Sequence, residues 1–339
     1  MSDYRLSKRA FLKSVTASFG LGCGGSLKHF PFDTMNTAFP TLGLELSFYG
    51  VGCFGFRYNG VQVLTDPFFT YLPLRTVAVG KVLPDPEQVD PYVDNFTDVK
   101  AMLVGHAHYD HNLDLPYIAK TLNEDCFVLG SKTLRHTFAP NTLPTPFVDM
   151  NDRVASKTKL GQWWVHPSKK FRVLPIVSAH PNQYLFFHLY KEEVNADRTT
   201  IPSKVHHYQE GMTFAFLLDF FPEDANADNA KPSVRIYIQS SSTGFPMGAF
   251  PKEILEEKEI DVACLAMDCA NLKMKGETTV IDEYPAKTTF FCHYEDFFRR
   301  KDQVPREIVK VDLPAAKEFF SDVSNKEFLF PIADSVFNL

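Results

Sequence analysis

The alternation of apolar and polar positions is clearest in the segment LELSFYGVGCFGFRYNGVQVLTDPFF, residues 44–69. Asn59-Gly60 stands between two apolar runs there. Asn-Gly favours a type I′ turn, because both central residues of that turn need positive φ. The pattern therefore predicts strands at about 44–57 and 61–65, paired as a hairpin.

The next strong pattern is DVKAMLVGHAH, in which a short apolar run predicts a buried strand at about 100–104. The segment DLPYIAKTLN follows. Asp114 is placed to cap a helix there, and Pro116 fits its first turn. A loop rich in histidine thus lies between a buried strand and a helix, where a rigid sheet commonly holds catalytic groups.

That loop, LVGHAHYDH at 103–111, carries four side chains of the kind that bind metal ions: His106, His108, Asp110 and His111. In an extended segment His106 and His108 point to the same side, and two neutral imidazoles suit one Zn²⁺ ion. The adjacent Asp110 and His111 point elsewhere, toward a second ion. A solvated polar loop is the alternative, but it explains one histidine better than this whole cluster.

Two later histidines repeat the arrangement of a strand followed by a possible ligand. FRVLPIVSAH is an apolar, β-branched run that ends at His180, and AKTTFFCH ends at His293. Together with the first cluster they complete two sets of three ligands. The remaining histidines lack this context, and we interpret them as surface or lining residues: His136, His166, His188, His206 and His207.

Composition places the chain among ordinary folded proteins. Hydrophobic residues make up 45% of its 339 residues, charged residues make up 22%, and the net charge is -6. An acidic balance argues against a nucleic-acid partner, because such proteins usually carry a basic face. No run of eighteen or more apolar residues predicts a membrane-spanning helix.

The first residues, MSDYRLSKRAFLKSVTASFGLGCGGS, have the layout of an export signal. SKRAFLK resembles the twin-arginine motif, with Lys8 in place of the first arginine, and GLGC resembles a bacterial lipobox with Gly20 in place of a larger aliphatic residue. We expect residues 1–37 to be an export segment that leads to the periplasm or cell envelope, with anchoring through lipid on Cys23. A cytoplasmic protein with a frayed N-terminus is the alternative.

In this order, the hairpin with Thr65-Asp66-Pro67, GHAHYDH, SAH and CHYEDFF resemble the metallo-β-lactamase superfold. The resemblance is to the branch of lactonase-like hydrolases and the phospholipase D acting on N-acylphosphatidylethanolamine. It implies an α/β (α+β) fold over 38–339: an αββα sandwich with metal at the sheet edge. It also implies a first site of His106, His108 and His180, and a second site of Asp110, His111 and His293. Asp66 would orient a ligand histidine.

One position departs from this family. Aligning VRIYIQSSSTGFP with the segment that normally holds a bridging aspartate puts Ser242 at the aspartate position. A neutral hydroxyl does not replace a carboxylate between two dications, so the number of ions is one or two. Asp268, in CLAMDCAN, is a possible substitute, although we favour its interpretation as an ordinary loop residue.

These ligands imply a zinc-dependent hydrolase in which metal-bound hydroxide attacks an ester, lactone, amide or phosphodiester. Asp110 is a candidate general base if its own metal site is empty. The expected partner is a small-molecule or lipid-like substrate, with no nucleic acid. Two alternatives stay open: a degenerate relative that binds metal or ligand without turnover, and a surface lipoprotein that uses the sandwich for protein contacts.

The N-terminal segment gives a first testable prediction. We expect Cys23 to become the mature N-terminus and to carry lipid, because a basic start and a short apolar stretch precede Gly22-Cys23. Mass spectrometry of protein from the membrane fraction checks this. A terminus at Met1 or Ser2 would contradict it.

Overall fold

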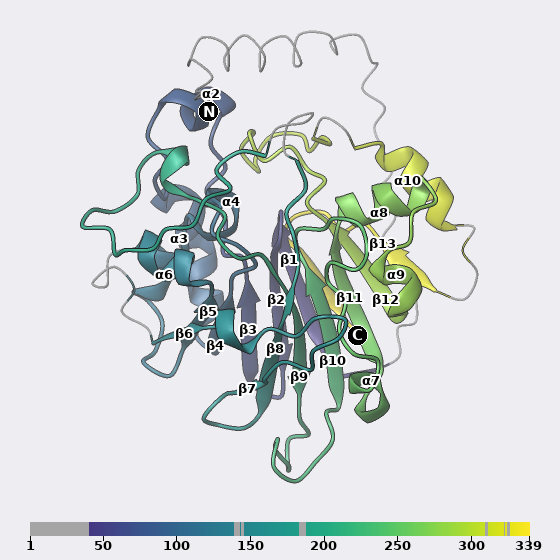
Figure 1. The fold of residues 1–339 in the computed structure, drawn as a ribbon. Coiled ribbons are helices and arrows are strands. Elements are labelled where there is room, and N and C mark those ends of the chain that lie inside the picture. The colour runs from purple at the N-terminus through teal and green to yellow at the C-terminus, as the bar shows by residue number, and fades with distance from the viewer. Residues whose placement is uncertain are drawn as a thin grey trace, which may run out of the picture. The chain divides into compact units, whose positions relative to one another are not determined.

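The computed structural model describes residues 41–138, 143, 146–182, 188–308, 311–321, 323 and 326–339. Residues 41–339 form one compact unit. Two sheets lie face to face in the middle of this unit, and helices cover their outer faces (Figure 1). The predicted αββα sandwich is confirmed. The predicted export segment, with Cys23, lies outside the described residues.

Each sheet has seven strands, and apart from β14, which lies beside β1, the strands of each sheet follow the order of the chain. The first sheet has the order β14-β1-β2-β3-β4-β5-β6, with β1 Glu45–Gly50, β2 Cys53–Tyr58, β3 Val61–Thr65, β4 Val99–Leu103, β5 Phe127–Gly130, β6 Phe147–Asp149 and β14 Ser335–Asn338. The second has the order β13-β12-β11-β10-β9-β8-β7, with β7 Trp164–Val165, β8 Phe171–Val177, β9 Phe214–Phe220, β10 Val234–Gln239, β11 Ile260–Ala266, β12 Ala286–Cys292 and β13 Glu327–Leu329.

The helices are short. Those flanking the first sheet are α2 Leu74–Val79, α3 Pro86–Val93, α4 Tyr109–Asn112, α5 Leu115–Ala119 and α6 Lys132–Thr137. Those flanking the second sheet are α7 Ile254–Glu257, α8 Met267–Met274, α9 Val280–Glu283 and α10 Leu313–Ser321. Single 3₁₀ turns occur at η1 Asp94–Phe96, η3 Asn151–Arg153 and η4 Val205–His207. None of the helices in the described part of the chain is long and apolar enough to cross a bilayer.

The first hairpin confirms one prediction and corrects another. Asn59 and Gly60 have φ of 49° and 73°, as a type I′ turn requires, and Tyr58 pairs with Val61 across it. The single strand predicted at 44–57 is wrong, because this run folds into the antiparallel pair β1 and β2. The chain reverses at Gly50, whose φ is 113°. A Cβ on Gly50 would lie 2.1 Å from the hydroxyl of Tyr71, so the turn requires glycine.

The strand predicted at 100–104 is β4, and a helix follows the histidine loop as expected. Asp114 does precede α5, but its carboxylate does not cap that helix. Its oxygens instead accept hydrogen bonds from the backbone of Phe69 and Thr70 and from the Thr70 hydroxyl, at 2.6–2.8 Å. Asp114 therefore holds the segment after β3 against the helix.

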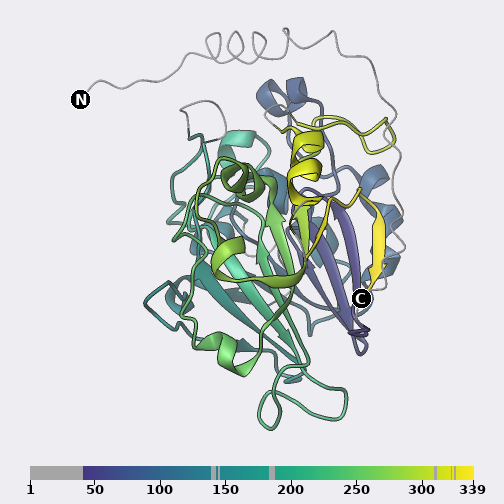
Figure 2. The same cartoon turned by 90° about the vertical axis from the view of Figure 1, so that its right-hand side faces the viewer.

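The core lies between the sheets and beneath the helices on both outer faces. Phe290 of β12 contacts Phe337 of β14 with ring centroids 4.9 Å apart, and Tyr58 contacts Phe220 at 5.6 Å, so side chains of the two sheets interdigitate. β9, β10 and β11 are buried along their whole length, as strands covered on both faces should be. The C-terminal β14 completes the first sheet beside β1, the yellow and purple strands of Figure 2.

A buried ion pair joins two central strands of the second sheet. Arg235 of β10 is fully buried and binds both carboxylate oxygens of Asp219 of β9 at 2.7 Å. The same guanidinium also donates to the carbonyls of Ile254 and Lys258. Glu257, which is partly exposed, also pairs with Arg235 at 3.3 Å, so Asp219 is the fully buried counter-charge of this guanidinium. Its loss should therefore destabilise the fold.

We expect Asp219→Asn to lower the free energy of unfolding by about 3–5 kcal/mol, because a buried cation loses its counter-charge. The control is Asp228→Asn, which breaks the exposed pair of Asp228 with Lys169 and should cost about 1 kcal/mol or less. Urea unfolding followed by tryptophan fluorescence measures both. Equal effects of the two changes would contradict the assigned role of the buried pair.

Candidate metal centre

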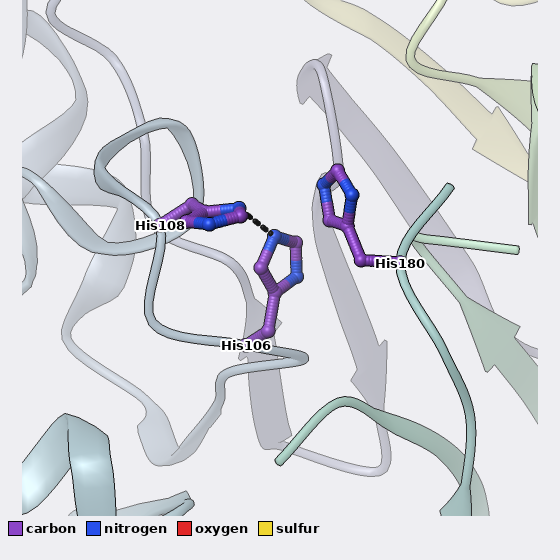
Figure 3. Close-up of side chains that lie close together, drawn as sticks. All are labelled: His106, His108 and His180. Atoms are coloured by element: carbon purple, nitrogen blue, oxygen red, sulfur yellow. Dashed lines mark hydrogen bonds between the residues drawn. The ribbon is translucent and has the colours of Figure 1, made fainter. Parts of the chain in front are cut away.

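Three histidines from two segments converge at the edge of the sandwich. His106 and His108 follow β4, and His180 follows β8 of the other sheet (Figure 3). Their ligand nitrogens all lie within 4.8 Å of one another, and Nε2 of His106 is 2.9 Å from Nδ1 of His108. Two nitrogens bound to one tetrahedral zinc ion lie about 3.3 Å apart. A dication fits this group with small movements of the rings.

Backbone carbonyls fix which nitrogen two of the rings present. Nε2 of His108 donates to the carbonyl of Tyr190 at 3.3 Å, and Nδ1 of His180 donates to the carbonyl of Pro181 at 2.6 Å. A carbonyl only accepts, so these nitrogens carry the protons and the opposite nitrogens keep their lone pairs. Nδ1 of His108 and Nε2 of His180 are therefore available to an ion, and Nε2 of His106 lies beside Nδ1 of His108.

Burial keeps these imidazoles neutral. It lowers the pKa of His108 to about 4, and it lowers the pKa of His106 and of His180 well below the ordinary value. Neighbouring imidazoles, His111 among them, lower the pKa of His106 further. Neutral, buried nitrogens with free lone pairs are the form that binds metal.

A second group of possible ligands lies beside the first. Asp110 and His111 lie in the short helix α4, not on the predicted loop, and His293 follows β12. Their ligand atoms also lie within 4.8 Å of one another, with Oδ2 of Asp110 3.4 Å from Nε2 of His293 and 3.7 Å from Nε2 of His111. The structure therefore brings all six predicted ligands together, in the two groups of three that the sequence indicates.

Charge within this second group favours an ionised carboxylate. Burial raises the pKa of Asp110, but His111 and a hydrogen bond from His293 outweigh it, and the pKa is lowered. Burial lowers the pKa of His293, yet Asp110 raises it more, to about 8. The ring nitrogens of His111 are buried and make no hydrogen bond to the described residues. A cation at Nε2 of His111 would satisfy one of them, so this group fits an ion too.

Asp66 lies beneath both groups, at the end of β3. Its Oδ1 accepts a hydrogen bond from the backbone N–H of Gly105 at 2.7 Å, and its Oδ2 lies 3.0 Å from Nδ1 of His111. The contact between Oδ2 of Asp66 and Nδ1 of His111 has an ion-pair distance but not the geometry of a hydrogen bond. With Nδ1 facing Asp66, Nε2 of His111 faces Asp110 and His293. Asp66 thus occupies the position from which a carboxylate orients a ligand histidine.

His293 is held in an uncommon backbone conformation. Its φ is 60°, and its backbone N–H donates to the carbonyl of Val51 at 3.0 Å. Val51 has φ of 52°, which is a genuine outlier for a β-branched residue. The backbone N–H of Val51 donates in turn to the carboxylate of Glu295. This clamp between the β1–β2 turn and the end of β12 sets the direction of His293.

Ser242 and Asp268, the two candidates for a bridging residue, lie in different surroundings. The hydroxyl of Ser242 donates to the carbonyl of Thr243 at 3.2 Å and also contacts the side chain of Cys269. Asp268 is in the first turn of α8. The parallel register pairs Ala266 with Cys292, which puts Asp268 next to His293 at adjacent strand ends, and its charge helps raise the pKa of His293.

Residues that the sequence did not single out also shape the site. A Cβ on Gly105 would lie 2.7 Å from the hydroxyl of Ser240, and one on Gly52 would lie 2.7 Å from Oδ2 of Asp66. These two glycines let the end of β10 and the turn before β2 close around Asp66. No local motif marks Ser240 for this position, since the contact depends on the packing of the two sheets.

Of the five histidines interpreted as surface or lining residues, His188 lies at the candidate centre. Its ring stacks on that of His180 with centroids 5.6 Å apart, and it bonds to Glu210. His136 pairs instead with Asp197 at an exposed position. The remaining three are His166, His206 and His207, and none of them belongs to a group of possible ligands in the described part of the chain.

Solved structures of metal-dependent hydrolases share this fold. Igni18, a metallo hydrolase of Ignicoccus hospitalis, has a TM-score of 0.52 at 13% identity, covering 87% of this chain and 99% of that one. A possible metal-dependent hydrolase of Veillonella parvula gives 0.52 at 10% identity, with 87% and 99% covered. An isothiocyanate hydrolase from Delia radicum gut bacteria gives 0.51 at 11% identity, with 87% and 99% covered.

Sequence similarity is confined to a short segment. A UPF0173 metal-dependent hydrolase of Exiguobacterium sp. (strain ATCC BAA-1283 / AT1b) is 34% identical over 77 residues, which are 23% of this chain and 28% of that protein. No protein-family model matches the chain. The chain has the metallo-β-lactamase fold, as its motifs predicted. The branch of lactonase-like hydrolases and phospholipase D stays a prediction.

The missing bridge generates a prediction about metal retention. We expect the ion of the second group to be lost first to a weak chelator, because Ser242 supplies no shared negative charge. Ser242→Asp should slow that loss, whereas Asp268→Asn should hasten it by removing the carboxylate next to His293. Dialysis against one chelator concentration, followed by elemental analysis per chain, measures all three proteins.

Ser242→Asn is the matched control, since it adds a side chain of similar size without the charge. If native protein holds two ions equally and none of the changes alters retention, neither residue acts on the second position.

Proposed function

We propose that the chain is a zinc-dependent hydrolase that cleaves an ester, lactone, amide or phosphodiester bond. The observation that carries this proposal is the convergence of three neutral imidazoles beside a half-buried carboxylate, that of Asp110, with two more histidines. The fold shared with solved metal-dependent hydrolases supports it, as does the short match to a curated one.

The trihistidine group, His106, His108 and His180, would hold the catalytic ion. A zinc ion there supplies a Lewis acid that polarises the substrate's oxygen and lowers the pKa of a bound water to about 7. Three neutral ligands leave the full positive charge on the ion, as in catalytic zinc sites with an open position. The carbonyls of Tyr190 and Pro181 keep the rings in the required orientation.

Two roles are open to Asp110 beside this ion: ligand of a second ion, or proton acceptor. With His111 and His293 it would hold a second ion. Where that position is empty, its carboxylate stays ionised at neutral pH, because His111 and His293 lower its pKa. It could then accept a proton close to the reacting groups, while its low exposure keeps bulk water away. The choice between these duties follows from the metal content, which makes metal counting the first measurement.

Ion binding without turnover is the second candidate function, and one position favours it. Ser242 stands where the family carries a carboxylate, and its hydroxyl is bonded to the neighbouring carbonyl of Thr243. A relative that lost the bridge would keep the trihistidine group and bind one ion. Such a protein would be loaded with zinc and inactive on every class of substrate.

The proposed function predicts that His106→Ala removes one zinc ion per chain and lowers kcat/KM by about a hundredfold or more, as expected when the Lewis acid is lost. Elemental analysis is combined with a panel of chromogenic esters, lactones, amides and phosphodiesters. His136→Ala is the control, because His136 pairs with Asp197 and belongs to neither of the two groups of ligands. Zinc-loaded native protein that is inactive on the whole panel would favour ion binding without turnover.

A further inference from the structure

A third group of ligand side chains shares His180 with the trihistidine group. His180, His188 and Glu210 offer ligand atoms that lie within 4.8 Å of one another. The ring of His188 is nearly parallel to that of His180, at 25°, and Nε2 of His188 bonds to the carboxylate of Glu210. Two imidazoles and a glutamate are an established ligand set for zinc. This group, called here the outer group, therefore has the composition of a metal site.

The outer group and the trihistidine group compete for the same nitrogen. Nδ1 of His180 is occupied by its hydrogen bond to the carbonyl of Pro181, at 2.6 Å. Nε2 is then the atom that His180 offers to either group, and one lone pair binds one ion. The two groups are therefore alternative sets of ligands for a single ion, with Nε2 of His180 common to both.

Solvent exposure and charge indicate which of the two groups a cation from solution reaches first. His106 and His108 are 1% and 5% exposed, whereas the side chain of His188 is 27% exposed. The trihistidine group contributes no charge of its own, but the outer group contains the carboxylate of Glu210. The side chain of Glu210 is only 9% exposed, so a cation from solution meets the imidazole of His188 first. The carboxylate of Glu210 lies directly behind that ring, and carboxylates raise the local concentration of cations.

Glu210 is held in place on both of its sides. Its Oε1 accepts a hydrogen bond from the hydroxyl of Thr213 at 2.9 Å. Its backbone carbonyl accepts from Ala107 at 3.0 Å, between the two histidines of the loop, and its backbone N–H donates to Tyr190 at 2.7 Å. The carbonyl of Tyr190 is also the one that orients His108. The outer group is thus built into the same framework as the trihistidine group.

We propose that the outer group is a loading position, from which an ion passes to His106 and His108 while His180 stays bound to it. The step exchanges His188 and Glu210 for His106 and His108 around one ion. It needs no release into solution, because His180 is a ligand on both sides. The inference rests on metal binding by the trihistidine group, which is part of the proposed function, but not on any hydrolytic activity.

The first experiment measures the rate of metal uptake. Full-length apo-protein is mixed with Co²⁺, and the visible absorbance of the bound ion is followed in a stopped-flow instrument. We expect Glu210→Gln to slow uptake by about tenfold or more, because the charge that attracts the ion is removed. The final absorbance should match that of the native protein. Asp197→Asn is the matched control, since it removes the same charge beside His136, and it should leave the rate unchanged.

The second experiment isolates the outer group at equilibrium. In the double variant His106→Ala, His108→Ala, the outer group is intact and should still bind a Co²⁺ ion. Adding Glu210→Gln to this variant should lower the count by one ion per chain. The same change in the native background should leave the count unaltered. Circular dichroism of each variant confirms that it is folded before the ions are counted.

Two outcomes overturn the inference. One is equal uptake rates for native protein and Glu210→Gln, and the other is an unchanged ion count when Glu210→Gln is added to the double variant. Failure of the proposed function looks different, since native protein would then bind Co²⁺ at the expected rate and yet hydrolyse no substrate. Uptake and hydrolysis are therefore measured on the same preparations.

Discussion

The hydrogen bond from the backbone of Gly105 to Asp66 is the contact on which the centre depends. It ties the start of the histidine loop to the end of β3, and the other oxygen of the same carboxylate faces His111. The position of Asp66 is set by the parallel pairing of β3 and β4. The pairing of β3 with β4 therefore helps to set the orientation of the His111 ring through Asp66. Two glycines and Ser240 close around this carboxylate, so that little room for its rotation remains.

The electrostatics of the candidate centre favour a cation over bound protons. Five histidines and Asp110 gather in a small buried volume, and burial works against any proton that a histidine would bind there. In the trihistidine group, Nε2 of His106 and Nδ1 of His108 share a hydrogen bond at 2.9 Å. A metal ion would take the place of the shared proton, because both nitrogens would then point at positive charge. The carbonyls of Tyr190 and Pro181 hold the opposite nitrogens of His108 and His180.

The sequence predicted the parts of the centre that are local. His106, His108, Asp110 and His111 lie in one short segment, and His180 and His293 each end an apolar run, so all six could be found from strand ends. The fold followed from the same motifs in order. The turn inside 44–57 was missed, because the β-branched Val51 between Gly50 and Gly52 is of a type that usually continues a strand, and here it has positive φ. The sequence also missed Glu210, which is far from His188 along the chain and reaches it only through tertiary packing.

The pairing of β14 with β1 has a consequence for how this domain is made. Leu44 and Leu339 exchange backbone hydrogen bonds at 2.8 and 3.2 Å. The strand β1 therefore completes its hydrogen bonds only with residues at the far end of the described chain. Contacts so distant in sequence are slow to form. During synthesis β1 therefore has one unpaired edge until β14 has emerged, and such an edge can pair with another chain. In a nascent molecule, pairing of the β1 edge with another chain thus competes with its pairing to β14.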